Sequence, residues 1–262
     1  MQVGISTAAL FPRKDTENAL KTIKSLQVEV TEAFLSTFYE YRPEFAKAVA
    51  PSAEGLNVNS VHVNSTNFEP NFFNPSRRVR GDGFYWLDQI CRSAQLFGSK
   101  NYTFHGFHRL CGACNDDFGQ IAEQLGEAAA FAKGYGVNLC LENVHWCLYN
   151  RPGVFAQLKQ RIPDLKGVLD IKQARRSHYP IGAYIKDMSG AIAYVHVSDV
   201  DGSGRMRLPG KGVYDFAEII KALIGEGFDG NLVIEVYSGD YGEIEELKQS
   251  CDYLSELVYR LV

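Results

Sequence analysis

The sequence predicts a closed (β/α)8 barrel, or TIM barrel, that spans residues 1–262 as one domain. Short strand-like runs alternate with helical stretches along almost the whole chain, which is the pattern of parallel strands joined by helices. Eight such strand–helix units fit into the 262 residues, and a single barrel commonly needs about 250. No linker, low-complexity tract or shift in composition divides the sequence. We therefore expect one barrel domain.

The predicted strands are short apolar runs, as expected where helices cover a parallel sheet. They are residues 3–7, 28–35, 58–65, 101–107, 137–143, 165–171, 192–199 and 230–237. An open, doubly wound sheet is the alternative, but no glycine-rich phosphate-binding turn follows the first run. The closed barrel is favoured for that reason.

A segment with helical spacing of apolar residues follows each predicted strand. In the first of these segments, apolar side chains recur at positions 19, 20, 23 and 26. The strongest pattern ends at Gly136, and Pro152 stands near the first turn of the next helix. The weakest pattern lies around 180–188. The predicted helices are residues 16–26, 44–56, 84–98, 118–136, 153–162, 180–188, 213–227 and 243–262.

Composition and charge argue against several classes of protein. A net charge of −4 makes nucleic-acid binding unexpected, since that usually requires a basic surface. No apolar run approaches the roughly 20 residues that span a bilayer, and the first residues lack the pattern of a signal peptide. Six scattered cysteines indicate reduced thiols. We expect a cytoplasmic protein without a membrane partner.

Four strand-like runs each carry, late in the run, one side chain that can bind a metal ion. They are LCLEN with Glu142, GVLDI with Asp170, AYVHV with His196, and LVIEV with Glu235. Burying a carboxylate costs several kcal/mol unless something pairs with it. In a barrel the carboxyl ends of the strands meet at one mouth, so a shared cation would offset that cost. Alternatively, each residue is a strand-end cap or half of an ion pair.

The chemistry of these four side chains favours a divalent cation. Two glutamates, one aspartate and one histidine suit Mn²⁺, Co²⁺, Mg²⁺ or Zn²⁺ and leave coordination positions free for substrate oxygens. The sequence therefore predicts one divalent metal ion, and no nucleotide cofactor.

The same segments resemble a known family. LEN, LDxxx, HVSD followed by LPGKG, and a final IE are similar to motifs of the xylose isomerase-like TIM barrel superfamily, and the resemblance is most specific across residues 194–216. That superfamily includes ketose 3-epimerases, hydroxypyruvate isomerases, inosose dehydratases and the AP endonuclease family 2 enzymes related to endonuclease IV. The resemblance implies that Glu142, Asp170, His196 and Glu235 hold the ion.

Two further histidines, His62 and His105, match earlier strands of the family. In endonuclease-type members the matching histidines bind an additional ion with the shared glutamate. The family's LDxxH histidine is replaced by Gln173 here, and its Asp-Arg-His loop motif by residues 204–206, so ligands of a third ion are missing. We favour one ion. A second ion on His62 and His105 stays open, as does hydrogen bonding to substrate.

For a one-ion site the resemblance implies isomerase or epimerase chemistry. The substrate would be a ketose or another small polyhydroxy carbonyl compound that reacts through an enediolate. Glu142 and Glu235 would serve as catalytic base and acid. The alternatives are an endonuclease IV-like phosphodiesterase, a related lyase or dehydratase, and a non-catalytic barrel subunit. A homodimer is expected by analogy alone.

Four residues are predicted to contact the substrate. Arg205 and Arg207 resemble the epimerases' substrate-contacting region and could bind a hydroxyl or phosphate group bidentately. Glu32 could hydrogen-bond a sugar hydroxyl, and Trp146 could wall the pocket. Solvated loop charges, core ion pairing and aromatic packing are the respective alternatives.

One further pattern is a C-x-x-C pair. Cys111 and Cys114 follow His105 and His108 at three-residue intervals. Such a pair can bind zinc or be redox-active, but the second half of a zinc ribbon is missing. We interpret both cysteines as reduced loop thiols.

Overall fold

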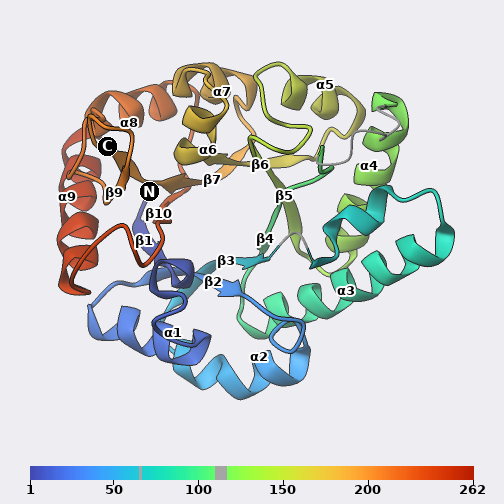
Figure 1. Cartoon of the computed structure of the whole chain (residues 1–262), viewed down its shortest axis with the longest axis horizontal. Helices are drawn as coiled ribbons and strands as arrows, with labels where there is room; N and C mark the ends of the chain where they lie inside the picture. The colour runs from blue at the N-terminus through green and yellow to red at the C-terminus, as the bar shows by residue number, and fades with distance from the viewer. Residues whose placement is uncertain (65–66, 110–116) are drawn as a thin grey trace.

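The computed structural model describes residues 1–64, 67–109 and 117–262. It is a closed barrel of parallel strands with helices packed around the outside (Figure 1). The strand order is β1-β10-β7-β6-β5-β4-β3-β2, and each strand pairs in parallel with both neighbours. The predicted (β/α)8 barrel is confirmed. Cys111 and Cys114 lie outside the described residues.

The barrel strands are short, and their side chains are almost all buried. They are β1 (Val3–Ser6), β2 (Val30–Leu35), β3 (Asn57–Val63), β4 (Asn101–Phe104), β5 (Asn138–Glu142), β6 (Lys166–Asp170), β7 (Ile192–Val197) and β10 (Asn231–Ile234). A small antiparallel hairpin of β8 (Asp199–Val200) and β9 (Met206–Arg207) follows β7. Each barrel strand therefore delivers its last residues to the same end of the barrel.

The helices cover the strands from outside and complete the core. They are α1 (Thr16–Ser25), α2 (Pro43–Val49), α3 (Arg77–Leu96), α4 (Phe118–Gly134), α5 (Val154–Arg161), α6 (Ile171–Arg176), α7 (Ile181–Asp187), α8 (Phe216–Gly225) and α9 (Glu245–Leu261). Short 3-10 turns are η1 (Thr7–Leu10), η2 (Ala50–Ala53) and η4 (Glu69–Phe73). None of the helices in the described ranges is both long and apolar enough to cross a membrane.

Two helices differ from the sequence-based expectation. α3 begins at Arg77 rather than at residue 84, because the glycines in its first turns conceal the helix pattern. Gly83 lies where an added Cβ would meet Asn71 and Phe72 at the ordinary contact distances of 3.4 and 3.5 Å, so α3 packs against η4 at this point. α6 was not predicted. Its six residues are too few to show a period, and it begins where the Asp170 side chain caps it.

Candidate metal and substrate site

A small apolar layer lies inside the barrel beneath its mouth. Its members come from four adjacent strands and are Cys140, Val168, Tyr194 and Val233. Side chains two residues apart on a strand point to the same face. The residues two positions further along the chain therefore stand above this layer, and they are Glu142, Asp170, His196 and Glu235.

These four predicted ligands converge on one point. One ligand atom from each lies within 4.8 Å of the others, and no residue of the four is more than 8% exposed. Ligand atoms bound at about 2.0–2.2 Å to a common ion stand roughly 3–4 Å apart. The spacing of the four side chains is thus compatible with a single cation held between them.

The two carboxylate oxygens of Asp170 differ in their contacts. Oδ1 accepts a hydrogen bond from the backbone N–H of Gln173 at 2.8 Å and so caps α6. Oδ2 is buried and has no hydrogen-bond partner among the described residues. The Asn143 side chain fixes the backbone at this position, since it accepts from the N–H of Asp170 at 2.7 Å and donates to its carbonyl at 2.9 Å. Asn143, the asparagine of LEN, therefore positions Asp170 on the adjacent strand.

The electrostatics of Asp170 test whether a cation fits here. Burial raises the pKa of Asp170 to about 8, although the nearby Lys172 ammonium opposes that rise. An unpartnered oxygen on a buried carboxyl group that resists ionisation is the situation that a bound cation relieves. The donor set and the orphaned oxygen both fit a divalent ion.

His196 is held between the ligand set and Glu32. Its Nδ1 lies 3.0 Å from Glu142 Oε1 and 3.9 Å from Glu235 Oε2, whereas its Nε2 contacts Glu32 Oε2 at 3.0 Å. A histidine that donates one N–H to a carboxylate presents the other nitrogen to a metal in a fixed tautomer. Nδ1 is therefore the nitrogen available to an ion.

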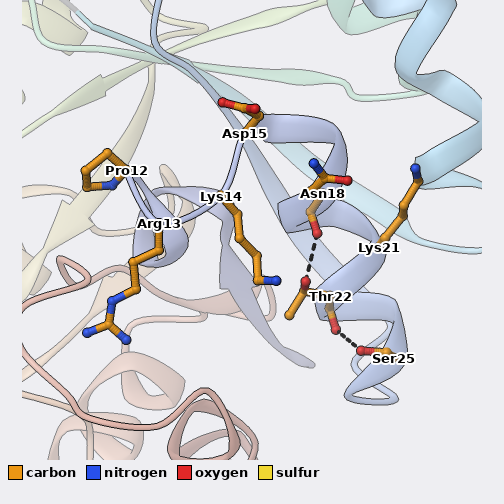
Figure 2. Close-up of a pocket in the computed structure, with 8 residues that line it drawn as sticks. All are labelled: Pro12, Arg13, Lys14, Asp15, Asn18, Lys21, Thr22 and Ser25. Atoms are coloured by element: carbon orange, nitrogen blue, oxygen red, sulfur yellow. Dashed lines mark hydrogen bonds between the residues drawn. The ribbon is translucent and has the colours of Figure 1, made fainter.

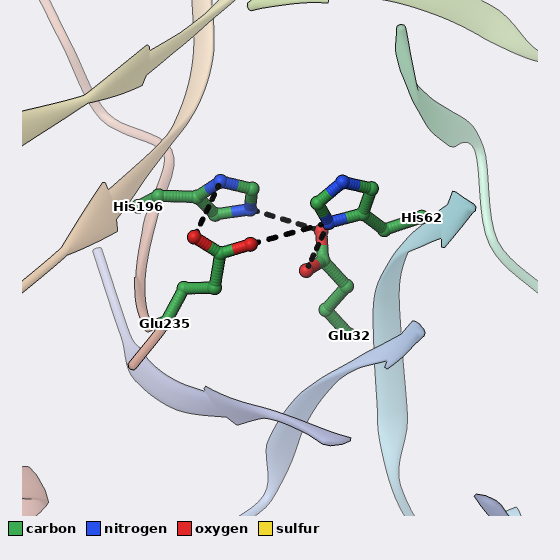
Figure 3. Close-up of side chains that lie close together, drawn as sticks. All are labelled: Glu32, His62, His196 and Glu235. Atoms are coloured by element: carbon green, nitrogen blue, oxygen red, sulfur yellow. Dashed lines mark hydrogen bonds and ion pairs between the residues drawn. The ribbon is translucent and has the colours of Figure 1, made fainter. Parts of the chain in front are cut away.

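Glu32 lies too deep to contact a substrate. Its side chain is fully buried and accepts hydrogen bonds from Ser6, Ser60 and Thr103. Burial alone would raise the pKa of Glu32, but His196 and His62 outweigh that effect and hold its pKa well below the usual value. Figure 3 shows Glu32 and Glu235 contacting both histidines. Glu32, for which a sugar contact was predicted, contacts two imidazoles and is not among the residues that line the cavity above the ligands.

His62 and His105 are also brought to the mouth, where they form a possible ligand group with Glu142. A third possible group consists of Glu32, His62, His196 and Glu235. Their Nε2 atoms lie 3.1 Å apart, and His105 Nε2 lies 3.2 Å from Glu142 Oε2. The Nδ1 of His105 is 3.3 Å from Glu69 Oε2. Burial would lower the pKa of His105, but Glu69 raises it to about 9. A proton or a cation is needed between two facing ring nitrogens.

Lys172, like Glu69, is a residue at this site that the sequence did not suggest. It lies in the first turn of α6 and is 3% exposed. Its Nζ donates to Glu235 Oε2 at 2.7 Å and lies 3.8 Å from Asp170 Oδ2. Burial opposes the charged form, but Glu235 and Asp170 together raise the pKa of Lys172 above its usual value. The lysine is therefore a buried ammonium ion beside two candidate metal ligands.

A cavity of about 450 Å³ opens above the ligand set. Its wall includes Trp146, which stacks on His105 with a 13° angle between the ring planes, as well as Phe34 and Arg176. Arg176 has no hydrogen-bond or ion-pair partner within residues 1–64, 67–109 and 117–262. The cavity thus joins a charged floor to aromatic walls and a cationic rim, which suits a polar ligand.

Arg205 and Arg207 do not line this cavity. They line a separate hollow beside the loop that follows β10, and Arg207 pairs with Asp201 at 3.0 Å. The loop that carries them is organised by Asp199, which is fully buried. Asp199 accepts backbone hydrogen bonds at 2.8–3.1 Å from residues 200, 210, 212 and 214. This explains the HVSD and LPGKG motifs, because a Cβ at Gly212 would lie 2.4 Å from the Asp199 carboxylate.

A larger hollow of about 590 Å³ lies on the outside of the barrel along α1 (Figure 2). Lysine and arginine side chains dominate its wall, and Asp15 is the one acidic residue among those lining it. The side chains of Thr22 and Ser25 are bonded to backbone carbonyls of the helix itself. Volume alone therefore does not identify the functional site, whereas converging ligand atoms do.

Comparison with known proteins agrees with the barrel fold. The family model described as "Xylose isomerase-like TIM barrel" matches residues 19–257. The structure of D-psicose 3-epimerase with D-tagatose from Clostridium cellulolyticum H10 superposes with a TM-score of 0.80 at 17% identity, covering 100% of this chain and 99% of that one. The IolI protein with a bound zinc atom superposes with a TM-score of 0.81 at 15% identity, covering 100% and 99%.

A curated relative matches part of the sequence. Fructoselysine 3-epimerase of Escherichia coli O157:H7 is 26% identical over 128 residues, which are 45% of this chain. The match spans 46% of the length of that relative. The structural likenesses at these identities establish the fold, and the family match covers most of the chain.

Proposed function

The chain belongs to the xylose isomerase-like TIM barrel family, and from this premise we propose that it is a divalent-metal-dependent isomerase or epimerase. The substrate is a ketose or another small polyhydroxy carbonyl compound. The observation that carries the proposal is the convergence of Glu142, Asp170, His196 and Glu235 within 4.8 Å at the floor of a cavity. Ketose 3-epimerases among the proteins of similar fold, and the partly matching fructoselysine 3-epimerase, support the reaction class.

The ion site consists of the same four side chains. A bound divalent ion would stabilise the negative charge that develops on a substrate oxygen when the neighbouring carbon loses a proton. We assign one ion to the chain, and the metal is Mn²⁺, Co²⁺, Mg²⁺ or Zn²⁺. Asp170 and His196 act as ligands only, because Asp170 also caps α6 and both ring nitrogens of His196 are engaged.

Glu142 and Glu235 are the proposed proton carriers. They stand on β5 and directly after β10, which β6 and β7 separate in the barrel. Both line the cavity, so a substrate between them would present opposite faces to the two carboxylates. One carboxylate then removes the C–H proton from one face, and the other returns a proton to the other face.

Trp146 and Arg176 are the proposed substrate contacts, since both line the cavity above the ligands. The tryptophan offers an apolar face to the carbon skeleton. Arg205 and Arg207 line another hollow and are not assigned a substrate contact.

Exchange of substrate C–H with solvent deuterium tests this proposal. The wild-type chain is assayed against ketoses, ketose phosphates and inososes with Mn²⁺, Co²⁺ and Mg²⁺. Exchange is expected with at least one ketose, and it should be lost in Glu142→Gln and Glu235→Gln. Glu256→Gln is a matched control, because Glu256 is exposed and pairs with Arg260. Exchange that persists in either variant contradicts the assigned role, and cleavage of an abasic-site DNA duplex would instead support the endonuclease alternative.

A further inference from the structure

Lys172 places a fixed positive charge inside the proposed ion site. Its ammonium lies 2.7 Å from Glu235 and 3.8 Å from Asp170, and it stands 4.8 Å from the centre of the Tyr237 ring. The side chain is 3% exposed, so water does little to screen it. Contacts with an aromatic face and a carboxylate together fix the position of the ammonium.

Charge counting gives this lysine a role. Glu142, Asp170 and Glu235 carry three negative charges when all are ionised, and His196 is neutral as a ligand. A divalent ion supplies two positive charges. Among these groups one negative charge is left over, and an uncompensated charge in a buried site is strongly unfavourable. Glu32, which is also buried, is paired with His62. The ammonium of Lys172 balances the charge that is left over.

We propose that Lys172 is a permanent cationic member of the ion site, which neutralises the third carboxylate, orients Glu235 and lowers the affinity for divalent ions. The inference rests on the proposed function in taking the four side chains as the ion site. The lysine and the ion repel each other while sharing Glu235 and Asp170. The bound ion is therefore held more loosely than three carboxylates and an imidazole alone would hold it, and the empty site is less repulsive.

Calorimetric titration of metal-stripped protein with Mn²⁺ tests the role of Lys172. Removing a unit positive charge about 5 Å from a divalent ion should tighten binding by about tenfold or more, even with a high effective dielectric constant. Lys172→Met should show this effect. Lys172→Gln, which keeps a donor for Glu235, should show it as well and serves if the methionine variant does not fold. Lys172→Arg keeps the charge and should stay within about threefold of wild type.

Lys186→Met is the matched control, since Lys186 is exposed on α7, and its Mn²⁺ affinity should equal that of wild type. Equal or weaker binding in both uncharged Lys172 variants overturns the proposal and leaves the isomerase function intact if wild-type exchange activity is present. Binding by Lys172→Met alone, with none by wild type, supports the role of the lysine and contradicts metal dependence of the natural chain. Binding by neither protein overturns the lysine's role, and the deuterium assay then decides the reaction class separately.

Discussion

The two sides of the barrel mouth contain similar residue types but arrange them differently. On the side of β5, β6, β7 and β10, the ligand atoms of three carboxylates and one imidazole face a common point, and one buried oxygen of Asp170 has no hydrogen-bond partner among the described residues. On the side of β2, β3 and β4, His62 contacts Glu32, which also contacts His196, and His105 contacts Glu69. A site that lacks one cation differs in this way from a site whose charges are already paired.

The largest effect is expected from Asp170→Asn, which breaks the first side. The amide oxygen can still cap α6. An NH2 group replaces the oxygen aimed at the ion, so the negative charge and one ligand atom are lost. Loss of an outer-shell partner costs about 10–100-fold in metal affinity, so loss of this ligand should cost more than about 100-fold. Calorimetric titration with Mn²⁺ measures the change. An unchanged affinity would show that the four side chains do not form an ion site.

A smaller effect is expected from Glu32→Gln, compared with Glu69→Gln, since Glu32 contacts the predicted ligand His196 whereas Glu69 contacts His105. Glu32 orients His196, so its loss should weaken Mn²⁺ binding by about 10–100-fold. Glu69 contacts His105 and Tyr102. The substitution Glu69→Gln should therefore leave Mn²⁺ binding nearly unchanged. Thermal unfolding of both variants controls for loss of structure. If Glu69→Gln weakens binding as strongly as Glu32→Gln, His105 is itself a ligand.

The number of bound ions sharpens the same comparison. Elemental analysis of protein purified with excess metal should give one equivalent per chain, because the histidine side already pairs its imidazoles with carboxylates. His62→Ala and His105→Ala should then retain that equivalent. Two equivalents in wild type, falling to one in these variants, would place a second ion between the two histidines and Glu142.

The smallest effect is expected at the rim of the cavity. Arg176→Met should raise KM for a phosphorylated ketose by about fivefold, the range of an exposed ion pair, with kcat and the KM for a neutral ketose unchanged. Arg175→Met is the control, because Arg175 interacts with Tyr214 and does not line the cavity. Equal KM changes for charged and neutral substrates would exclude an anion contact at Arg176.

The positions that could be predicted from the sequence are those of residues at the ends of strands. Glu142 and Asp170 end apolar runs, and strand ends meet in a barrel, so their convergence could be predicted along with the fold. Glu69 and Lys172 were not predicted as site residues because neither lies at the end of a strand. Glu69 is in a short 3-10 turn, and Lys172 is in a helix too short to show a period.

Loops were predicted least well, for a related reason. The position of Arg207 depends on the hairpin of β8 and β9 and on its pairing with Asp201, which no local pattern reveals. Glu32 was recognised as polar and late in its strand, but the sequence did not show that three hydroxyl groups and two imidazoles enclose it. These hydroxyl groups and imidazoles belong to segments that are far from Glu32 in the sequence, so a local pattern cannot predict the contacts.

The carboxylate of Asp199 has a consequence for recognition. By gathering amides from residues 200–214, it gives this stretch its shape before any small molecule arrives. A segment that is ordered in advance loses little conformational entropy on association. The free energy of association with a ligand on this stretch is therefore not reduced by the cost of ordering a flexible loop.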